Sequence, residues 1–95
     1  MENERLIPLE TVCHQYRIEA SFIRSLSEYG LIEIIHFDET DCIDRDYLGE
    51  IEKMMNLHYE LNINMEGIDA ISHLLKRVKE MQKELVTLRN RLGNL

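Results

Sequence analysis

The chain has 95 residues and a formal net charge of −7, and 44% of its residues are hydrophobic while 31% are charged. This composition predicts one small globular domain and excludes a disordered chain, and the apolar runs are too short for the roughly 20 residues of a membrane-spanning helix. Residues 1–64 carry 14 acidic and 5 basic side chains, whereas residues 65–95 carry 4 acidic and 6 basic ones, so the front two thirds repels nucleic acid and favours a basic partner.

Residues 9–32 have the pattern of a helix-turn-helix, with the turn at residues 16–18. Apolar residues three and four positions apart mark one face of the first helix: Leu9, Val12, Cys13 and Tyr16. The second helix, from about residue 19 to 29, is expected to bury Phe22, Ile23, Leu26 and Tyr29. Gly30 is suited to end this helix, because glycine adopts the left-handed conformation without strain.

A β-hairpin is predicted after the second helix. Residues 32–37 and 42–43 are strand-like, with four polar turn residues between them, and together they would make a hairpin wing. Residues 5–8 are expected to be an extended lead-in, since Pro8 disfavours helix in the residue before it. Asp44 is suited to cap a third helix. The buried stripe of that helix is expected to be Leu48, Ile51, Met54, Met55 and His58.

The last helix is expected to run from its cap, Asn64, to about Leu92. Its apolar residues are separated alternately by three and four positions: Ile71, Leu74, Val78, Met81, Leu85, Leu88 and Leu92. This is the seam of a coiled coil, and because the third helix is about half as long, the pattern predicts a homodimer through these dimerisation residues rather than an internal hairpin. The pattern does not distinguish parallel from antiparallel pairing. The chain would divide into a winged helix-turn-helix domain at 1–63 and a dimerisation helix at 64–95.

The order of these elements resembles that of the MerR-like winged-helix proteins. In their second helix a Thr-Leu-Arg-Tyr-Tyr-like run precedes Gly-Leu, and Phe22-Ile23-Arg24-Ser25-Leu26 occupies those places here, before Gly30-Leu31. Only Arg24 is kept from the polar set, and Glu28 stands where these regulators often have a basic residue. Their wing is basic, whereas this one reads Phe37-Asp38-Glu39-Thr40-Asp41.

A closer resemblance is to the chaperone-modulator (CbpM) family of small MerR-like proteins. Residues 57–68 are similar to the family's Leu-x-x-Asp-Leu-x-Ile-Asn-x-x-Gly-Val region, with Glu60 in place of the usual Asp, and the resemblance covers residues 6–92. It implies a mostly α-helical protein that binds the J-domain of a DnaJ-like (CbpA-type) co-chaperone and inhibits its co-chaperone activity toward Hsp70. It also favours antiparallel pairing of the dimerisation helices.

Seven charged residues are candidates for contact with that partner: Arg17, Arg24, Glu28, Glu33, Asp38, Glu39 and Asp41. The acidic ones would complement a basic helix of the J-domain, and such complementarity mainly raises association rate and specificity. The alternative is ordinary solvated surface, and for the two arginines an internal ion pair with Glu10 or Glu28. The alternative function is a MerR-type DNA-binding transcriptional regulator, which the helix-turn-helix favours and the acidic charge opposes.

No enzymatic activity, cofactor or metal site is expected. The sequence has no glycine-rich phosphate loop, nucleophile elbow or His-Glu pair at metal spacing. Cys13 and Cys42 lack the close spacing of paired zinc ligands and are expected to be buried thiols, which a reducing compartment would preserve. The first residues lack the basic-then-apolar order of a secretion signal, so a cytoplasmic location is the default expectation.

Overall fold

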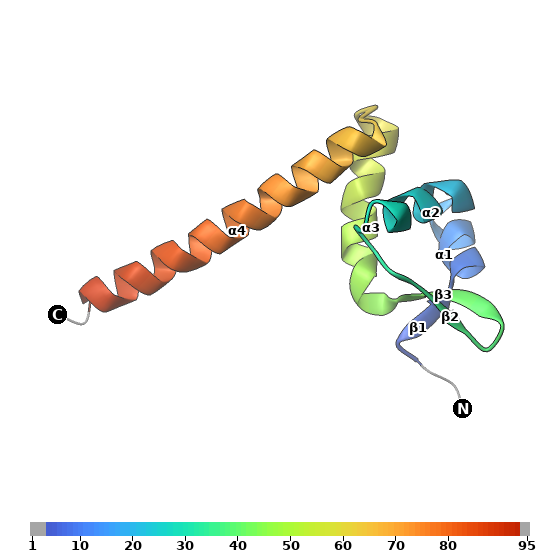
Figure 1. The fold of residues 1–95 in the computed structure, drawn as a ribbon, viewed down its shortest axis with the longest axis horizontal. Coiled ribbons are helices and arrows are strands. Elements are labelled where there is room, and N and C mark those ends of the chain that lie inside the picture. The colour runs from blue at the N-terminus through green and yellow to red at the C-terminus, as the bar shows by residue number, and fades with distance from the viewer. Residues whose placement is uncertain (1–3, 94–95) are drawn as a thin grey trace.

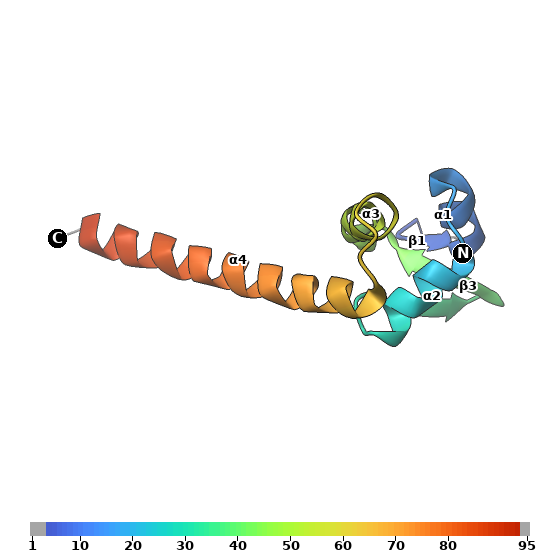
Figure 2. The same cartoon turned by 90° about the horizontal axis from the view of Figure 1, so that it is seen from above.

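The computed structural model describes residues 4–93, which form a small head and a long helical arm (Figure 1 and Figure 2). The elements in chain order are β1 (Leu6–Pro8), α1 (Leu9–Tyr16), α2 (Ala20–Glu28), β2 (Ile34–Phe37), β3 (Thr40–Asp44), α3 (Leu48–Met55) and α4 (Met65–Gly93). The protein is mostly helical with one small sheet, as the sequence predicts. Among the helices described, none combines the length and apolarity needed to cross a bilayer.

The two helices that the sequence predicts near the N-terminus are present and are joined by a tight turn. Arg17, which follows α1, has a φ of 56°, so the chain leaves that helix through the left-handed region. Gly30 has a φ of 74°, and the N–H of Leu31 donates to the carbonyl of Leu26 at 3.0 Å. These features form a Schellman ending for α2 and confirm the predicted role of Gly30.

The sheet has three antiparallel strands in the order β1-β3-β2, with Ile7 opposite Ile43 and Ile35 opposite Cys42. The extended lead-in that the sequence predicts is therefore an edge strand, which is a position that tolerates Pro8. The prediction of a four-residue turn between the hairpin strands is wrong. The turn has only two residues, because Thr40 pairs with Phe37 and already belongs to β3.

The third helix of the sequence analysis is divided into three segments. Asp44 is a cap, as predicted, but its Oδ1 accepts the N–H of Asp46 at 2.9 Å and so caps a 3₁₀ turn at Arg45–Tyr47. The α-helix α3 follows, and it continues into a π-helical turn at Asn56–Glu60. The wider turn rotates the following side chains around the helix axis before the chain turns toward α4. The apolar spacing of the sequence does not predict this π-helical turn.

The core lies in the head and receives side chains from every helix. Its fully buried large members are Val12, Ile23, Leu26, Ile43, Ile51 and Ile68. Ile68 comes from the first turns of α4 and is the one fully buried residue of this helix within the described range. The start of the arm is therefore part of the head's core.

A set of local contacts fixes the junction between α3 and α4. The Oδ1 of Asn64 accepts the N–H of Gly67 at 2.8 Å, which confirms the predicted helix cap. Nδ1 of His58 lies 3.0 Å from the carbonyl oxygen of Ile63. Tyr29 was expected to be buried but is 37% exposed, and its hydroxyl donates to Glu66 Oε1 of α4 at 2.8 Å.

We expect Gly67→Ala to destabilise the fold, although alanine favours helix. A Cβ at this position would lie 2.6 Å from Cγ2 of Ile63 and 3.1 Å from the capping Oδ1 of Asn64. Forced overpacking of this kind costs about 1–3 kcal/mol. Urea unfolding followed by circular dichroism at one fixed protein concentration measures the change in the free energy of unfolding.

Gly49→Ala in α3 is the matched control, because no atom lies within 4 Å of the position its Cβ would take. Removing glycine from a helix without a clash stabilises it by about 0.5–1 kcal/mol. Equal stabilisation by both substitutions would show that the close contact at Gly67 does not constrain the junction.

Candidate functional site

The hairpin between β2 and β3 ends in two adjacent carboxylates. Asp38 and Glu39 have φ values of 52° and 61°, which are the two left-handed positions of a type I′ turn. Both side chains are exposed, and the neighbouring Phe37 is 41% exposed. The tip therefore presents two negative charges beside an aromatic ring.

Behind the tip, Asp41 joins the hairpin to α2. Its Oδ2 accepts from Nη2 of Arg24 at 3.0 Å, and its Oδ1 lies 3.1 Å from Nδ1 of His36. Hydrogen bonding by His36, and then by Arg24, holds the pKa of the Asp41 carboxyl below its usual value. Arg24 therefore forms an internal ion pair, as the alternative interpretation of the sequence had it, but its partner is Asp41 rather than Glu10 or Glu28.

This ion pair bears on whether Arg24 could contact DNA. It is the one polar residue that resembled the phosphate-binding set of the DNA-binding regulators, and an acidic residue of the hairpin neutralises it. A phosphate oxygen would have to compete with a carboxylate already held at 3.0 Å. The pair therefore disfavours DNA contact at this position.

The other candidate contact residues do not gather into one cluster. Arg17 lies at the end of α1, Glu28 is the last residue of α2, and Glu33 lies in the loop before β2. All three are exposed. The structure thus brings together Arg24 and Asp41 and places Asp38 and Glu39 at the hairpin tip, and the contact role of all seven residues stays a prediction.

The arm carries the most extensive exposed apolar surface of the described chain. Every residue from 73 to 93 is exposed, so the head leaves most of this stretch uncovered. The exposed fractions of its large apolar side chains are 60% for Leu74, 48% for Leu75, 46% for Val78, 51% for Met81, 53% for Leu85, 55% for Val86, 54% for Leu88 and 69% for Leu92. An apolar surface of this extent is typical of a protein-binding face. Leu75 and Val86 lie outside the heptad positions, so the heptad pattern does not predict their part in this surface.

In the part of the chain that the structure describes, no three His, Cys, Asp or Glu residues are arranged to hold a metal ion. Cys42 is buried, as predicted, and Cys13 is only partly buried. Burial raises the pKa of the Cys13 thiol, which lowers its reactivity as a nucleophile.

Residues 57–68, which carry the closer family resemblance, build the junction between α3 and α4. Their contacts include the cap by Asn64, the bond of His58 and the close approach of Gly67 to Ile63. The sequence predicts the cap at Asn64 but not the contacts of His58 and Gly67, which depend on how the chain folds back at Ile63.

Comparisons with known proteins give a consistent result. The family model described as MerR HTH family regulatory protein matches residues 7–90. The chain is 24% identical over 88 residues to a chaperone modulatory protein CbpM of Pseudomonas entomophila, and the match covers 92% of this chain and 87% of that protein. It is 26% identical over 88 residues, with the same coverage, to a chaperone modulatory protein CbpM of Pseudomonas putida. No solved structure matches the chain significantly.

We expect Asp41→Asn to reduce the loss of stability in acid. Because the folded-state pKa of Asp41 lies below its ordinary value, its ionisation stabilises the fold above pH 4 or so, and this contribution is lost as the pH falls through the lowered pKa. Unfolding curves from about pH 6 to pH 2 should show a smaller decrease in the free energy of unfolding for the variant.

Arg24→Gln provides the matched control, since it leaves the carboxylate in place but removes one of its partners. It should weaken the acid dependence in the same direction, to a smaller extent, because the hydrogen bond from His36 remains. If the free energy of unfolding fell equally in acid for the wild type and Asp41→Asn, the assignment of this pH dependence to Asp41 would be contradicted.

Proposed function

The chain belongs to the MerR HTH family of regulatory proteins, and from this membership and its CbpM relatives we propose that it is a chaperone modulator without enzymatic activity. Its partner would be the J-domain of a DnaJ-like, CbpA-type co-chaperone. The observation that carries this choice is the acidic head, whose helix-turn-helix is paired with an acidic hairpin tip at Asp38 and Glu39. A basic partner fits such a surface better than nucleic acid does.

The proposed mechanism is occlusion. A J-domain that uses a basic helix to engage Hsp70 would meet the carboxylates of the hairpin and the front of the head, and the bound head would block that helix. Long-range attraction between opposite charges speeds the encounter, whereas the exposed ring of Phe37 supplies apolar contact at the tip. Inhibition would then require no chemistry, only a surface that competes with Hsp70.

The second candidate function is a DNA-binding regulator, which the family model favours. Two observations weigh against it: the head is strongly acidic, and Arg24 is engaged by Asp41. Binding to duplex DNA that falls steeply with salt concentration in a gel-shift series would favour this function over the J-domain proposal.

We expect Asp38→Asn combined with Glu39→Gly to weaken J-domain capture. Asn-Gly is the preferred type I′ turn, so the double variant keeps the hairpin while removing both tip charges. Loss of two interfacial charges should reduce affinity roughly tenfold, mainly through the association rate and most strongly at low salt. Surface-plasmon resonance against an immobilised CbpA-type J-domain measures both rates.

The control for this measurement combines Glu60→Gln with Glu80→Gln, which removes two negative charges away from the hairpin. It should retain most of the affinity, because only the general charge of the molecule changes. If the control weakens capture as much as the tip variant, the hairpin is not the contact surface.

We also propose that the arm forms a homodimer through its heptad seam. Seven large apolar side chains follow the seam, and the six from Leu74 to Leu92 are 46–69% exposed, which a single chain leaves in water. A second copy of α4 would cover them, in the antiparallel arrangement that the family resemblance favours. The helix is about 43 Å long at 1.5 Å per residue, enough for several layers of packing.

Val78→Asp combined with Leu85→Asp should convert the dimer to a monomer, because charges at the centre of an apolar seam are desolvated without partners. Sedimentation velocity at micromolar concentration gives the mass directly. The control is Lys83→Asp with Asn90→Asp, which adds aspartates on the opposite face of the helix and should leave a dimer. A monomeric wild type would contradict the proposed dimer.

Charge exchanges determine the orientation. Flanking positions would bring Arg77 near Glu84 of the second copy in an antiparallel pair, and Glu84 near Arg89 of the second copy in a parallel pair. Glu84→Arg should therefore weaken the dimer and be rescued by Arg77→Glu. Rescue by Arg89→Glu instead would establish parallel pairing.

A further inference from the structure

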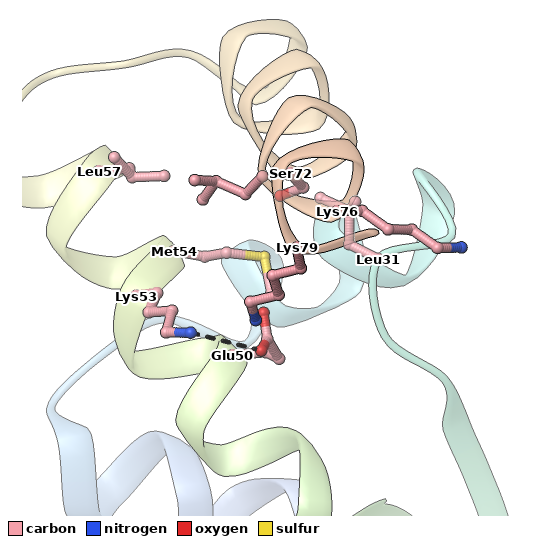
Figure 3. Close-up of a pocket in the computed structure, with 9 residues that line it drawn as sticks. Leu31, Glu50, Lys53, Met54, Leu57, Ser72, Lys76 and Lys79 are labelled. Carbon is pink, nitrogen blue, oxygen red and sulfur yellow. Dashed lines mark ion pairs between the residues drawn. The ribbon is translucent and has the colours of Figure 1, made fainter. Parts of the chain in front are cut away.

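A groove lies in the angle between α3 and α4, with a volume of about 290 Å³ (Figure 3). Its apolar lining consists of Leu31, Met54, Leu57 and Leu75. Met54 is only 3% exposed and belongs to the core, so the floor of the groove is fixed by core packing. A second hollow, lined by Tyr29, Gly30 and His73, shares Leu31, Ser72 and Lys76 with the first and extends the groove toward the end of α2.

The polar rim of the groove is basic although the head is acidic. Lys53, Lys76 and Lys79 line it together with one carboxylate, Glu50. Glu50 lies 3.7 Å from Nζ of Lys53, which leaves the charges of Lys76 and Lys79 in excess at the rim. The groove therefore combines an apolar floor with a positively charged rim, whereas the hairpin tip is negatively charged.

The groove and the heptad seam occupy different sides of α4. The groove uses Ser72, Leu75 and Lys79, whereas the neighbouring seam residues are Leu74 and Val78. Leu75 borders the seam, whereas Ser72, Lys76 and Lys79 lie farther around the helix, so pairing of two arms through the seam leaves the lysine side of the groove accessible. Leu75 thereby receives a role that the heptad pattern does not assign.

The groove is also preformed. The angle between α3 and α4 is set by the burial of Ile68, the cap at Asn64 and the bond from Tyr29 to Glu66. A site held by core and cap contacts loses little entropy when it is occupied.

We propose that this groove binds a short acidic peptide segment that carries a large apolar side chain, supplied by a partner protein other than the J-domain. The apolar side chain would enter between Leu31, Met54 and Leu75, and flanking carboxylates would meet Lys76 and Lys79. Lysines act as point charges without the fixed fork of arginine, so they suit flexible carboxylates. The volume is at the lower limit for small-molecule sites, which favours one or two side chains over a cofactor.

The test uses a fluorescein-labelled peptide, Glu-Asp-Leu-Glu-Glu-Leu-Phe-Glu, and the full chain in fluorescence anisotropy. The wild type should bind it, and affinity should fall at least fivefold when salt is raised from 50 to 500 mM. Lys76→Glu combined with Lys79→Glu should reduce affinity at least tenfold. Lys83→Glu, a lysine of the same helix outside the groove, should change it less than twofold. The NMR signals of isotope-labelled methyl groups of Met54 and Leu75 should change position when the peptide binds.

The proposal would be overturned if the wild type did not bind the peptide, or if Lys83→Glu reduced affinity as much as Lys76→Glu combined with Lys79→Glu. It would also be overturned by control peptides that bind as tightly as the original. One control peptide has lysines in place of the acidic residues, and the other has alanines in place of Leu and Phe. The dimer-breaking variant Val78→Asp with Leu85→Asp should still bind, and loss there would assign the groove to a second copy instead. J-domain capture should persist in Lys76→Glu with Lys79→Glu. Its loss would assign the groove to the J-domain, whereas absence of capture by the wild type would contradict the proposed function alone.

Discussion

The burial of Ile68 is the contact on which the arrangement of the whole molecule depends. It places the first turns of α4 inside the core of the head, and the Asn64 cap and the Tyr29–Glu66 hydrogen bond then fix the direction in which the helix leaves. Since every residue from 73 to 93 is exposed, the buried start of the helix contributes most to where the exposed seam points. The groove beside α3 and the outward seam are both consequences of that one angle.

Charge is distributed so that the scaffold favours proteins over nucleic acid. The acidic residues are concentrated before residue 65, and Asp41 occupies the guanidinium of Arg24. A helix-turn-helix uses cations on its second helix to hold phosphates, so the ion pair disfavours that contact at Arg24. The excess positive charge instead lies on α4, along the arm and at the groove. The two parts of the molecule therefore present surfaces of opposite sign.

The sequence predicts those features that local rules determine. Apolar spacing identifies the four helices, and the roles of Gly30, Asp44 and Asn64 follow from the chemistry of helix ends. It does not predict the partner of Arg24, because Asp41 lies 17 positions away and meets it only after the hairpin folds back on α2. The groove is unpredictable for the same reason, since its lining comes from three segments brought together by the junction. The π-helical turn has no apolar period that distinguishes it from α-helix.

The hairpin tip shows how local strain relates to function. A type I′ turn favours Asn-Gly, yet this chain places Asp38 and Glu39 in the two left-handed positions. For a residue such as Glu39 that conformation costs on the order of 1 kcal/mol, and the hydrogen bond from Thr40 Oγ1 to the Asp38 carbonyl, at 3.4 Å, offsets little of it. Glycine would remove the strain but also one charge. The presence of two carboxylates at a strained, exposed turn accords with the proposed contact of the tip with a basic partner, for which their charge matters more than the ease of the turn.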